Sequence, residues 1–299
     1  MIIILATMEK ERIEGAIIEE PEQAPASSWV LVSQFFIVPV VIIALCVGIF
    51  ILFGLITGES RSARDYVEEV KAGKGSRRWQ AAFELSKYLN YRDNTKADSR
   101  LARDIIYALH NARDDDPRVR QYLALALGKL HDRTAVEPLV ESLGDSDPNT
   151  RLYSVWALGE LGDARALEPL IKMGEDTDPQ IRKTVAYSLG MIGDSRAVPH
   201  LRAAVNDRSE DVRWNAALAL ARMKDASGLE VLHQMLDRKY LESLPELKGH
   251  QISEAMINAA SAVAILQDTS ARPLLEEARR NDKDLKVRAA AIDALKKIP

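Results

Sequence analysis

The side chains that most often carry catalysis are present, but they form no catalytic pattern. Five histidines lie far apart, without the short spacing that shared metal ligation requires: His110, His131, His200, His233 and His250. The only cysteine, Cys46, lies in the most apolar stretch and cannot form an internal disulfide. The chain has no phosphate-binding G-x-x-x-x-G-K-S/T loop, no G-x-S-x-G and no G-x-G-x-x-G. We therefore expect no catalytic residue, metal, cofactor or small-molecule substrate.

Aspartate and arginine recur in pairs six positions apart, and these residue types suit either acid–base chemistry or ion pairs. The pairs are Asp114/Arg120, Asp145/Arg151, Asp176/Arg182, Asp207/Arg213 and Asp282/Arg288. A catalytic carboxylate has no need of five copies in one register, so we interpret the pairs as a structural ladder. Each Asp would accept hydrogen bonds from free amides at a turn, and each Arg would bridge neighbouring repeats.

The ladder lies within a longer repeat. Asp-Pro occurs at 116–117, 147–148 and 178–179, each 31 positions after the last, and Leu-Gly at 127–128, 158–159 and 189–190 keeps the same step. Asp caps free helix amides and Pro fits the first helical position, whereas the Gly-Asp that follows ends a helix. Apolar residues between these landmarks recur at helical spacing, and no segment alternates like a strand. The pattern predicts an all-α chain of helix pairs.

We expect about seven such pairs. The first helices should begin near Ser62, Ser99, Thr134, Arg165, Arg196, Ser227 and Ser270. The second helices should begin near Gly75, Pro117, Pro148, Pro179, Glu210, Gln251 and Asp284.

The unit D-P-x-V-R-x-x-A-x-x-A-L-G-x-L-G-D resembles the HEAT-like repeat first described in phycobilisome (bilin) lyases, over about residues 61–298. The resemblance implies a right-handed α-solenoid whose second helices line a concave side, and an Asp/Arg ladder along the stack. Two units depart from the pattern. The first has Ala72 where the ladder Asp belongs, and the sixth has His250 and Met256 at the ladder positions and is longer, with an insertion near 238–250. The insertion is either a surface loop or an element that contacts a partner or the membrane.

Large apolar residues recur one and five positions after the ladder Arg of each second helix, which places them on one helical face. The candidate partner-binding residues are Trp79, Phe83, Leu125, Leu152, Trp156, Tyr187, Trp214 and Leu218. One interpretation is an exposed apolar groove, which on a protein surface marks a binding site. The other is ordinary core, because a shift of the helix phase by one position would bury some of these side chains.

Residues 29–57 contain no charged side chain, and Val32 to Leu55 would span about 36 Å as a helix, enough to cross a bilayer. We expect one transmembrane helix here. Six basic residues follow it closely, from Arg61 to Arg78, whereas only Lys10 and Arg12 precede it. The positive-inside rule then places the N-terminus outside and the repeat domain, 61–299, in the cytoplasm, most simply at a bacterial inner membrane. Residues 1–28, acidic and then rich in Pro, Ala and Ser, are expected to form a disordered tail.

Charge separates the remaining function classes. Beyond residue 28 the chain holds as many acidic as basic side chains, which gives no general electrostatic reason to bind nucleic acid. We expect a non-enzymatic, membrane-tethered scaffold or adaptor that binds protein partners, including an accessory subunit of a membrane complex. The resemblance to bilin lyases keeps a second hypothesis open, a tetrapyrrole lyase or chaperone-like protein with a flat pigment on the aromatic face.

Overall fold

The computed structural model describes residues 29, 36–57, 61–91 and 99–299. The chain divides into two compact units, Met1–Ser60 and Arg61–Pro299, and each is described by itself. The expected disordered tail, residues 1–28, lies outside the described residues, as do residues 30–35 of the expected membrane segment.

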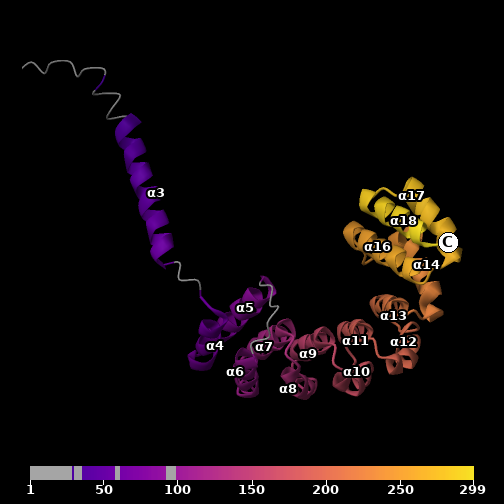
Figure 1. The fold of residues 1–299 in the computed structure, drawn as a ribbon, viewed down its shortest axis with the longest axis horizontal. Coiled ribbons are helices and arrows are strands. Elements are labelled where there is room, and N and C mark those ends of the chain that lie inside the picture. The colour runs from indigo at the N-terminus through magenta and orange to yellow at the C-terminus, as the bar shows by residue number, and fades with distance from the viewer. Residues whose placement is uncertain (1–28, 30–35, 58–60, 92–98) are drawn as a thin grey trace, which may run out of the picture. The chain divides into compact units, whose positions relative to one another are not determined.

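The first unit contains helix α3, Val38–Thr57, which follows a short π-helical turn (Figure 1). The large apolar side chains described along it are all exposed, from Val38 at 47% to Phe50 at 81%. Of the transmembrane helix expected over 29–57, the structure describes Trp29 and residues 36–57, with side chains as far as Leu52. Within the described part of the chain, no helix combines the length and the apolar character needed to cross a membrane.

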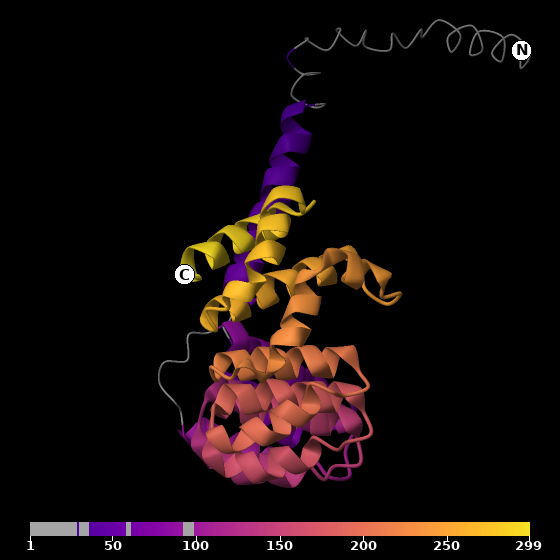
Figure 2. The same ribbon diagram turned by 90° about the vertical axis from the view of Figure 1, so that its right-hand side faces the viewer.

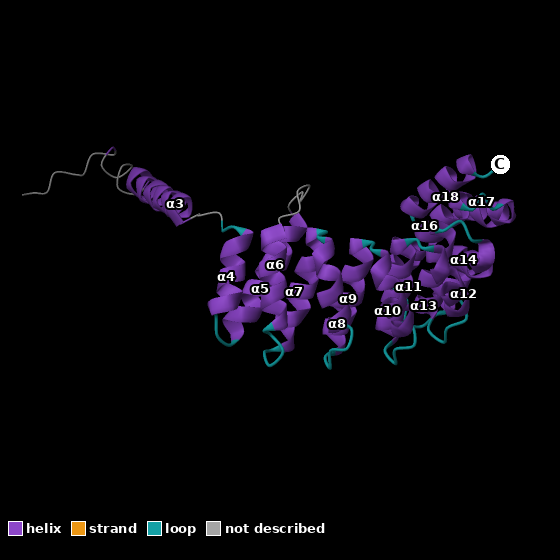
Figure 3. Ribbon diagram, turned by 60° about the horizontal axis from the view of Figure 1, so that its bottom comes forward, coloured by secondary structure: helices purple, strands orange, loops and turns teal. Residues whose placement is uncertain are grey.

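The second unit is all-helical over its described residues, 61–91 and 99–299 (Figure 3). Seven helix pairs follow one another along it. The pairs are α4 (Ala63–Ala72) with α5 (Ser76–Tyr91), α6 (Ser99–His110) with α7 (Pro117–Leu130), α8 (Val136–Ser142) with α9 (Pro148–Leu161), α10 (Leu167–Met173) with α11 (Pro179–Ile192), α12 (Val198–Ala204) with α13 (Glu210–Arg222), α14 (Leu229–Leu236) with α16 (Gly249–Ile265), and α17 (Arg272–Asn281) with α18 (Leu285–Lys297). The 3₁₀ turns η2 (Arg133–Ala135), η3 (Ala164–Ala166), η4 (Ser195–Ala197), η5 (Ala226–Gly228) and η6 (Thr269–Ala271) lead into the first helices of the later pairs, and the short α15 (Arg238–Ser243) lies inside the sixth pair.

Helix starts follow the capping chemistry of the repeat. Asp147 caps α9 by accepting a hydrogen bond from the Thr150 amide at 2.7 Å, and Pro148 occupies the first helical position. The helix ends at Gly162, whose φ of 60° is left-handed and suits glycine. Asp163 then caps η3. The same order of cap, helix, left-handed end and second cap recurs 31 positions later at α11.

The second helices of neighbouring repeats pack directly on one another, and the first helices cover them from outside. Figure 1 shows α5, α7, α9, α11 and α13 along the inner side of a curved row, with α4, α6, α8, α10 and α12 along the outer side. In the view turned by 90°, these helices lie in layers (Figure 2). We call the inner side of the row the concave face.

Glycines set how closely the second helices approach. A Cβ on Gly159 of α9 would lie 2.8 Å from the Cα of Ser188 in α11, and a Cβ on Gly190 would lie 2.9 Å from the Cα of Ala219 in α13. The Leu-Gly landmark of the sequence is therefore the contact point between consecutive repeats.

Candidate protein-binding surface

The ladder residues join each repeat to the next. Arg120 Nε and Nη2 donate to the carboxylate of Asp145 at 2.6 and 3.0 Å, and Arg182 contacts Asp207 in the same way at 2.9 Å. Arg151 Nε donates to Asp176 at 3.2 Å. Each of these arginines therefore pairs with the carboxylate 25 positions further on, in the following repeat.

The Asp and Arg of one repeat meet through the main chain instead. Arg151 Nη1 donates to the carbonyl of Asp145 at 3.1 Å, and Arg182 Nη1 donates to that of Asp176 at 2.9 Å. The Asp145 carboxylate also accepts the Asp147 amide at 2.9 Å. The pairs are buried for the most part, so they position helices and offer no free group to a substrate.

Three expected ladder positions behave differently. Asp114 is exposed, and its neighbour Asp115 pairs with Arg78 of the first repeat, because the longer turn before Asp116 shifts the register by one residue. Arg213 donates to the Asp207 carbonyl at 3.0 Å and to Glu210 at 3.1 Å, but has no carboxylate partner in the sixth repeat. Arg288, in the last described repeat, donates to the carbonyl of Asp282.

The insertion restores the ladder where the sixth repeat lacks its arginine. Met256 occupies the ladder position in α16 and is buried. Arg238, at the start of α15, reaches Asp282 of the seventh repeat instead. Residues 238–250 were interpreted either as a surface loop or as an element that contacts a partner or the membrane. The structure shows that they include a short helix, α15, whose Arg238 joins the sixth repeat to the seventh.

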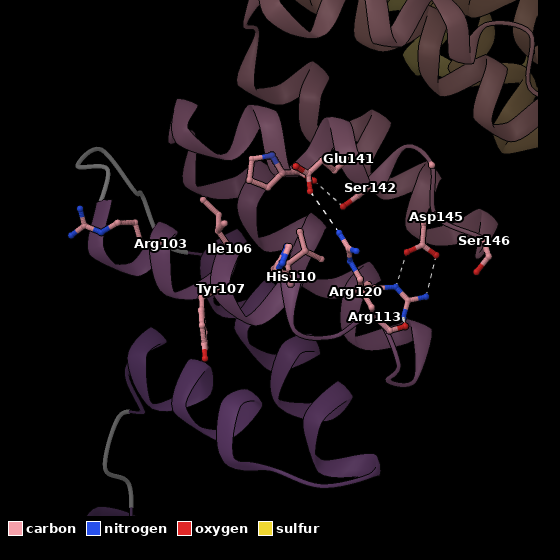
Figure 4. Close-up of a pocket in the computed structure, with 13 residues that line it drawn as sticks. Arg103, Ile106, Tyr107, His110, Arg113, Arg120, Glu141, Ser142, Asp145 and Ser146 are labelled. Atoms are coloured by element: carbon pink, nitrogen blue, oxygen red, sulfur yellow. Dashed lines mark hydrogen bonds and ion pairs between the residues drawn. The ribbon is translucent and has the colours of Figure 1, made fainter.

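Three pockets lie beside ladder pairs and share one origin. The first, about 600 Å³, lies between α6 and α8 and includes Arg120 and Asp145 (Figure 4). The second, about 390 Å³, includes Arg182 and Asp207, and the third, about 690 Å³, includes Arg238 and Asp282. Because the same pair recurs in each pocket, we attribute these cavities to the repeat architecture and not to a specific ligand.

The residue five positions after each ladder Arg lies on the concave face. Phe83 is 36% exposed, and the others in this column are half-buried: Leu125, Trp156, Tyr187 and Leu218. These side chains are neither fully buried nor fully exposed. Their bodies pack on the repeat and one side of each remains open to solvent.

The column one position after the ladder Arg faces the next repeat. Trp214 is only 7% exposed and belongs to the core, so the expectation that it lines an open groove is wrong. Trp79 lies under Arg118 of α7, at 4.1 Å from the ring centroid, and Leu152 packs partly buried against the core. Gln121 shows the reason, since its Nε2 donates at 2.9 Å to Asp147, the cap of the next second helix. This column contacts the first turn of the neighbouring helix and leaves little area for a partner.

Cations cover the rings of the concave face. Lys129 Nζ lies 4.6 Å from the centroid of Trp156, Lys87 Nζ lies 5.2 Å from Phe83, and the Arg222 guanidinium lies 5.9 Å from Tyr187. Such stacking favours the charged form near the ring and gives an apolar surface a positive edge.

The sequence analysis did not identify a second set of residues on the concave face. They occupy the positions two and nine after each ladder Arg and share the concave face with the column five after it: Tyr122, Lys129, Tyr153, Met191, Asn215, Arg222, Asn258 and Ile265. Reading the 31-residue step through these two columns would have found most of them.

A fourth pocket, of about 380 Å³, lies on the concave face between α11, α13 and α16 and contains no ladder pair. Tyr187 and Leu218 from the predicted set line it, together with Asn215, Arg222, Asn258, Ser261 and Ile265. We call it the α13/α16 crevice.

The histidines have separate surroundings. His233 Nε2 lies 2.6 Å from Asp268, and His131 Nδ1 lies 3.2 Å from the Glu160 carbonyl. Within the described residues, no three His, Cys, Asp or Glu side chains gather as a metal site would require.

The fold and its concave face define an α-solenoid of helix pairs joined by an arginine–aspartate ladder. Comparison with known families matches HEAT repeats to residues 103–178 and 167–243. Residues 103–243 therefore consist of HEAT repeats. None of the curated proteins matches it.

Two solved structures are similar to this chain. A chain in the complex of CpcE and CpcF of phycocyanin lyase from Nostoc sp. PCC7120 is 23% identical, with a TM-score of 0.50, covering 81% of this chain and 96% of that one. The Escherichia coli protein YibA is 17% identical, with a TM-score of 0.49 over 82% of this chain and 96% of that one. At these identities the likeness concerns the fold alone.

Proposed function

We propose that this HEAT-repeat protein is a non-enzymatic scaffold that binds a segment of a protein partner along its concave face. The observation that carries the proposal is the row formed by Phe83, Leu125, Trp156, Tyr187 and Leu218. These side chains come from five successive second helices, and each keeps one side open to solvent. Aromatic residues with adjacent cations are the side chains that contribute most at protein interfaces.

The periodic origin of the ladder and of the three outer pockets supports a binding role over catalysis. The ladder carboxylates of Asp145, Asp176, Asp207 and Asp282 each form an ion pair with an arginine, so none of these four is free to act as an acid or base. A solenoid also offers a long curved surface whose residues come from many repeats, which suits an elongated protein ligand.

Partner capture with paired variants tests this function. The full chain, carrying Trp156→Ala, should lose binding by about 2 kcal/mol or more when its partner is retrieved from native membranes. Tyr107→Ala is the matched control, because Tyr107 is an exposed aromatic residue, at 63%, on the outer helix α6. Thermal unfolding of both variants shows that the folded state persists. Equal capture by the two variants would move the binding site away from the concave face.

We also propose that residues 29–57 hold the repeat unit at a membrane, with the N-terminus outside and the repeats in the cytoplasm. The support is an uncharged segment followed by Arg61, Arg64, Lys71, Lys74, Arg77 and Arg78. The exposed apolar side chains of α3 also need a cover, either lipid or protein. A tether of this kind raises the effective concentration of the scaffold near membrane partners.

A second candidate is a lyase or chaperone that handles a tetrapyrrole. It is favoured by the fold shared with a phycocyanin lyase subunit and by the half-open ring of Trp156, on which a flat pigment can stack. Titration of the purified chain with phycocyanobilin, followed by absorbance, separates the candidates. A spectral shift that Trp156→Ala removes would favour the lyase-like role, and an unchanged spectrum would favour the scaffold.

A further inference from the structure

The α13/α16 crevice lies where the ladder is interrupted. Arg213 of the fifth repeat has no ladder carboxylate to contact in the sixth, and two core clusters meet at α13. From α7 to α13, neighbouring second helices are joined both by a ladder pair and by a glycine contact. At α13 and α16 the ladder pair is missing, and the crevice opens on the concave side of this junction.

The crevice has an apolar part and a polar part. Leu218, Ala219, Ala262 and Ile265 supply the apolar part, and Ile265 is 50% exposed. Asn215, Asn258, Ser261 and Arg222 supply the polar part. The Asn215 amide and the Ser261 hydroxyl already donate within their own helices, at 2.8 and 3.1 Å. The guanidinium of Arg222 is thus the charged donor that remains open to a ligand, beside the neutral amide of Asn258.

Arg222 differs in its partners from the ion-paired arginines of the stack. Arg120, Arg151, Arg182, Arg202 and Arg238 each contact a carboxylate. Arg222 contacts the Tyr187 ring and, through Nη1, the sulfur of Met191 at 3.1 Å, and it forms no salt bridge within the described residues, although Glu160 accepts a hydrogen bond from the Tyr187 hydroxyl at 3.2 Å. It is also the one charged side chain among the described residues that line the crevice. An exposed guanidinium beside apolar side chains is suited to a carboxylate carried next to an apolar group.

We propose, building on the scaffold function, that the partner segment is acidic. Its Asp or Glu side chain pairs with Arg222, and an adjacent Leu, Ile or Phe side chain fills the crevice against Leu218 and Ile265. Charge complementarity extends along the same face, because Lys129 over Trp156 and Lys87 over Phe83 offer further positive charges. Glu160, 4.0 Å from Lys129, and Glu84, 3.2 Å from Lys87, offset both of them, so Arg222 is the principal anchor. A basic segment would meet Arg222 with like charge.

Selection from a displayed library of random peptides tests the chemistry, with the full chain in detergent as the target. The enriched peptides should carry Asp or Glu beside Leu, Ile or Phe. One enriched peptide, made synthetically with a fluorescent label, should bind Arg222→Gln about tenfold more weakly in fluorescence anisotropy. Arg280→Gln on α17 is the matched control, since Arg280 is also exposed and should leave the affinity unchanged.

A charge swap completes the test. The same peptide with Lys in place of its acidic residue should bind Arg222→Glu more tightly than it binds the native chain. Enrichment of basic or uncharged peptides, or equal affinity for Arg222→Gln and the native chain, would overturn the proposal. Preferential binding of a labelled single-stranded oligonucleotide in place of peptides would overturn it too. If Trp156→Ala still loses the native partner in these cases, the scaffold function stands and only the acidic partner fails.

Discussion

Arg238 and Asp282 form a bidentate ion pair across the last two repeats. Arg238 Nε and Nη2 donate to the two carboxylate oxygens at 2.6 and 2.8 Å, and the Asp282 side chain is 2% exposed. Asp282 also accepts the Asp284 amide at 2.8 Å, as ladder aspartates do in other repeats. The arginine, however, comes from the inserted helix α15 and not from α16. The insertion therefore replaces a missing ladder residue with one from a different helix.

The first prediction concerns this replacement. Arg238→Ala should lower the free energy of unfolding by about 3–5 kcal/mol, because it leaves the buried Asp282 carboxylate without its cation. Since each repeat contacts only its neighbours, the loss should fall on α16 to α18. Hydrogen exchange measured by mass spectrometry should show faster exchange there and unchanged exchange in α7 and α9.

Arg280→Ala serves as the control for that measurement. Arg280 pairs with Glu276 at the surface, where removal of an ion pair changes stability by about 0.5 kcal/mol or less. Equal exchange in Arg238→Ala and Arg280→Ala would show that α15 has no role in stability.

The second prediction uses the glycine contact between α9 and α11. A Cβ at position 159 would lie 2.5 Å from the Oγ of Ser188 and 2.8 Å from its Cα, so Gly159→Ala must push the helices apart. We expect a loss of about 1–3 kcal/mol in urea unfolding. Gly144→Ala, whose nearest neighbour lies at 3.6 Å, should change stability by about 0.5 kcal/mol or less.

A double variant distinguishes the cause of that loss. Ser188→Ala removes the hydroxyl but leaves the Cα in place, so it should not rescue Gly159→Ala. Full rescue would mean that the hydroxyl, and not the approach of the two backbones, limits this position.

The third prediction is a pH dependence. The Arg202 guanidinium beside Asp225 lowers the pKa of that carboxyl from 3.8 to about 2, with further hydrogen bonds from Ser227. A carboxyl whose pKa is lower in the folded state stabilises the fold above the unfolded value, and this stabilisation is lost as pH falls toward the folded value. Arg202→Gln should therefore cost about 1 kcal/mol at pH 6, allowing for the exposure of Arg202, and the difference should shrink between about pH 4 and pH 2.

Urea titrations of the native chain and Arg202→Gln at several pH values measure this effect. A difference that stays constant from pH 6 to pH 2 would show that Arg202 acts through packing and not through its charge.

The sequence predicts the repeat closely because its signals are local. Asp-Pro caps start helices at Pro117, Pro148 and Pro179 as expected, and the expected starts of the later helix pairs lie within a few residues of the observed ones. Local chemistry could not show which carboxylate each ladder Arg contacts, since that carboxylate lies 25 positions away. The sequence analysis also chose Asp114 as a ladder residue where the structure has Asp115, because the turn before Asp116 is one residue longer than in the other repeats.

The candidate surface was harder to predict than the fold. Trp214 and Leu218 lie four positions apart on one helix, yet Trp214 is buried against the next repeat and Leu218 faces the crevice. Helical periodicity alone cannot separate the two positions, because the angle between neighbouring repeats decides which side is covered. Arg222 and Arg238 were missed because their roles depend on the sixth repeat, where the regular step is broken.

The last prediction concerns the membrane and the placement of the two ends of the chain across it. In a Cys46→Ser background, a single thiol is introduced at Ser27→Cys, before the uncharged segment, or at Asn90→Cys, which is exposed at the end of α5. An impermeant maleimide applied to intact cells should label position 27 and spare position 90, because the six basic residues after the segment favour retention on the cytoplasmic side. After permeabilisation both positions should label equally, which shows that each thiol is reactive. Labelling of position 90 in intact cells would reverse the proposed orientation. Recovery of the chain in the soluble fraction after lysis would instead remove the membrane tether and leave α3 to be covered by protein.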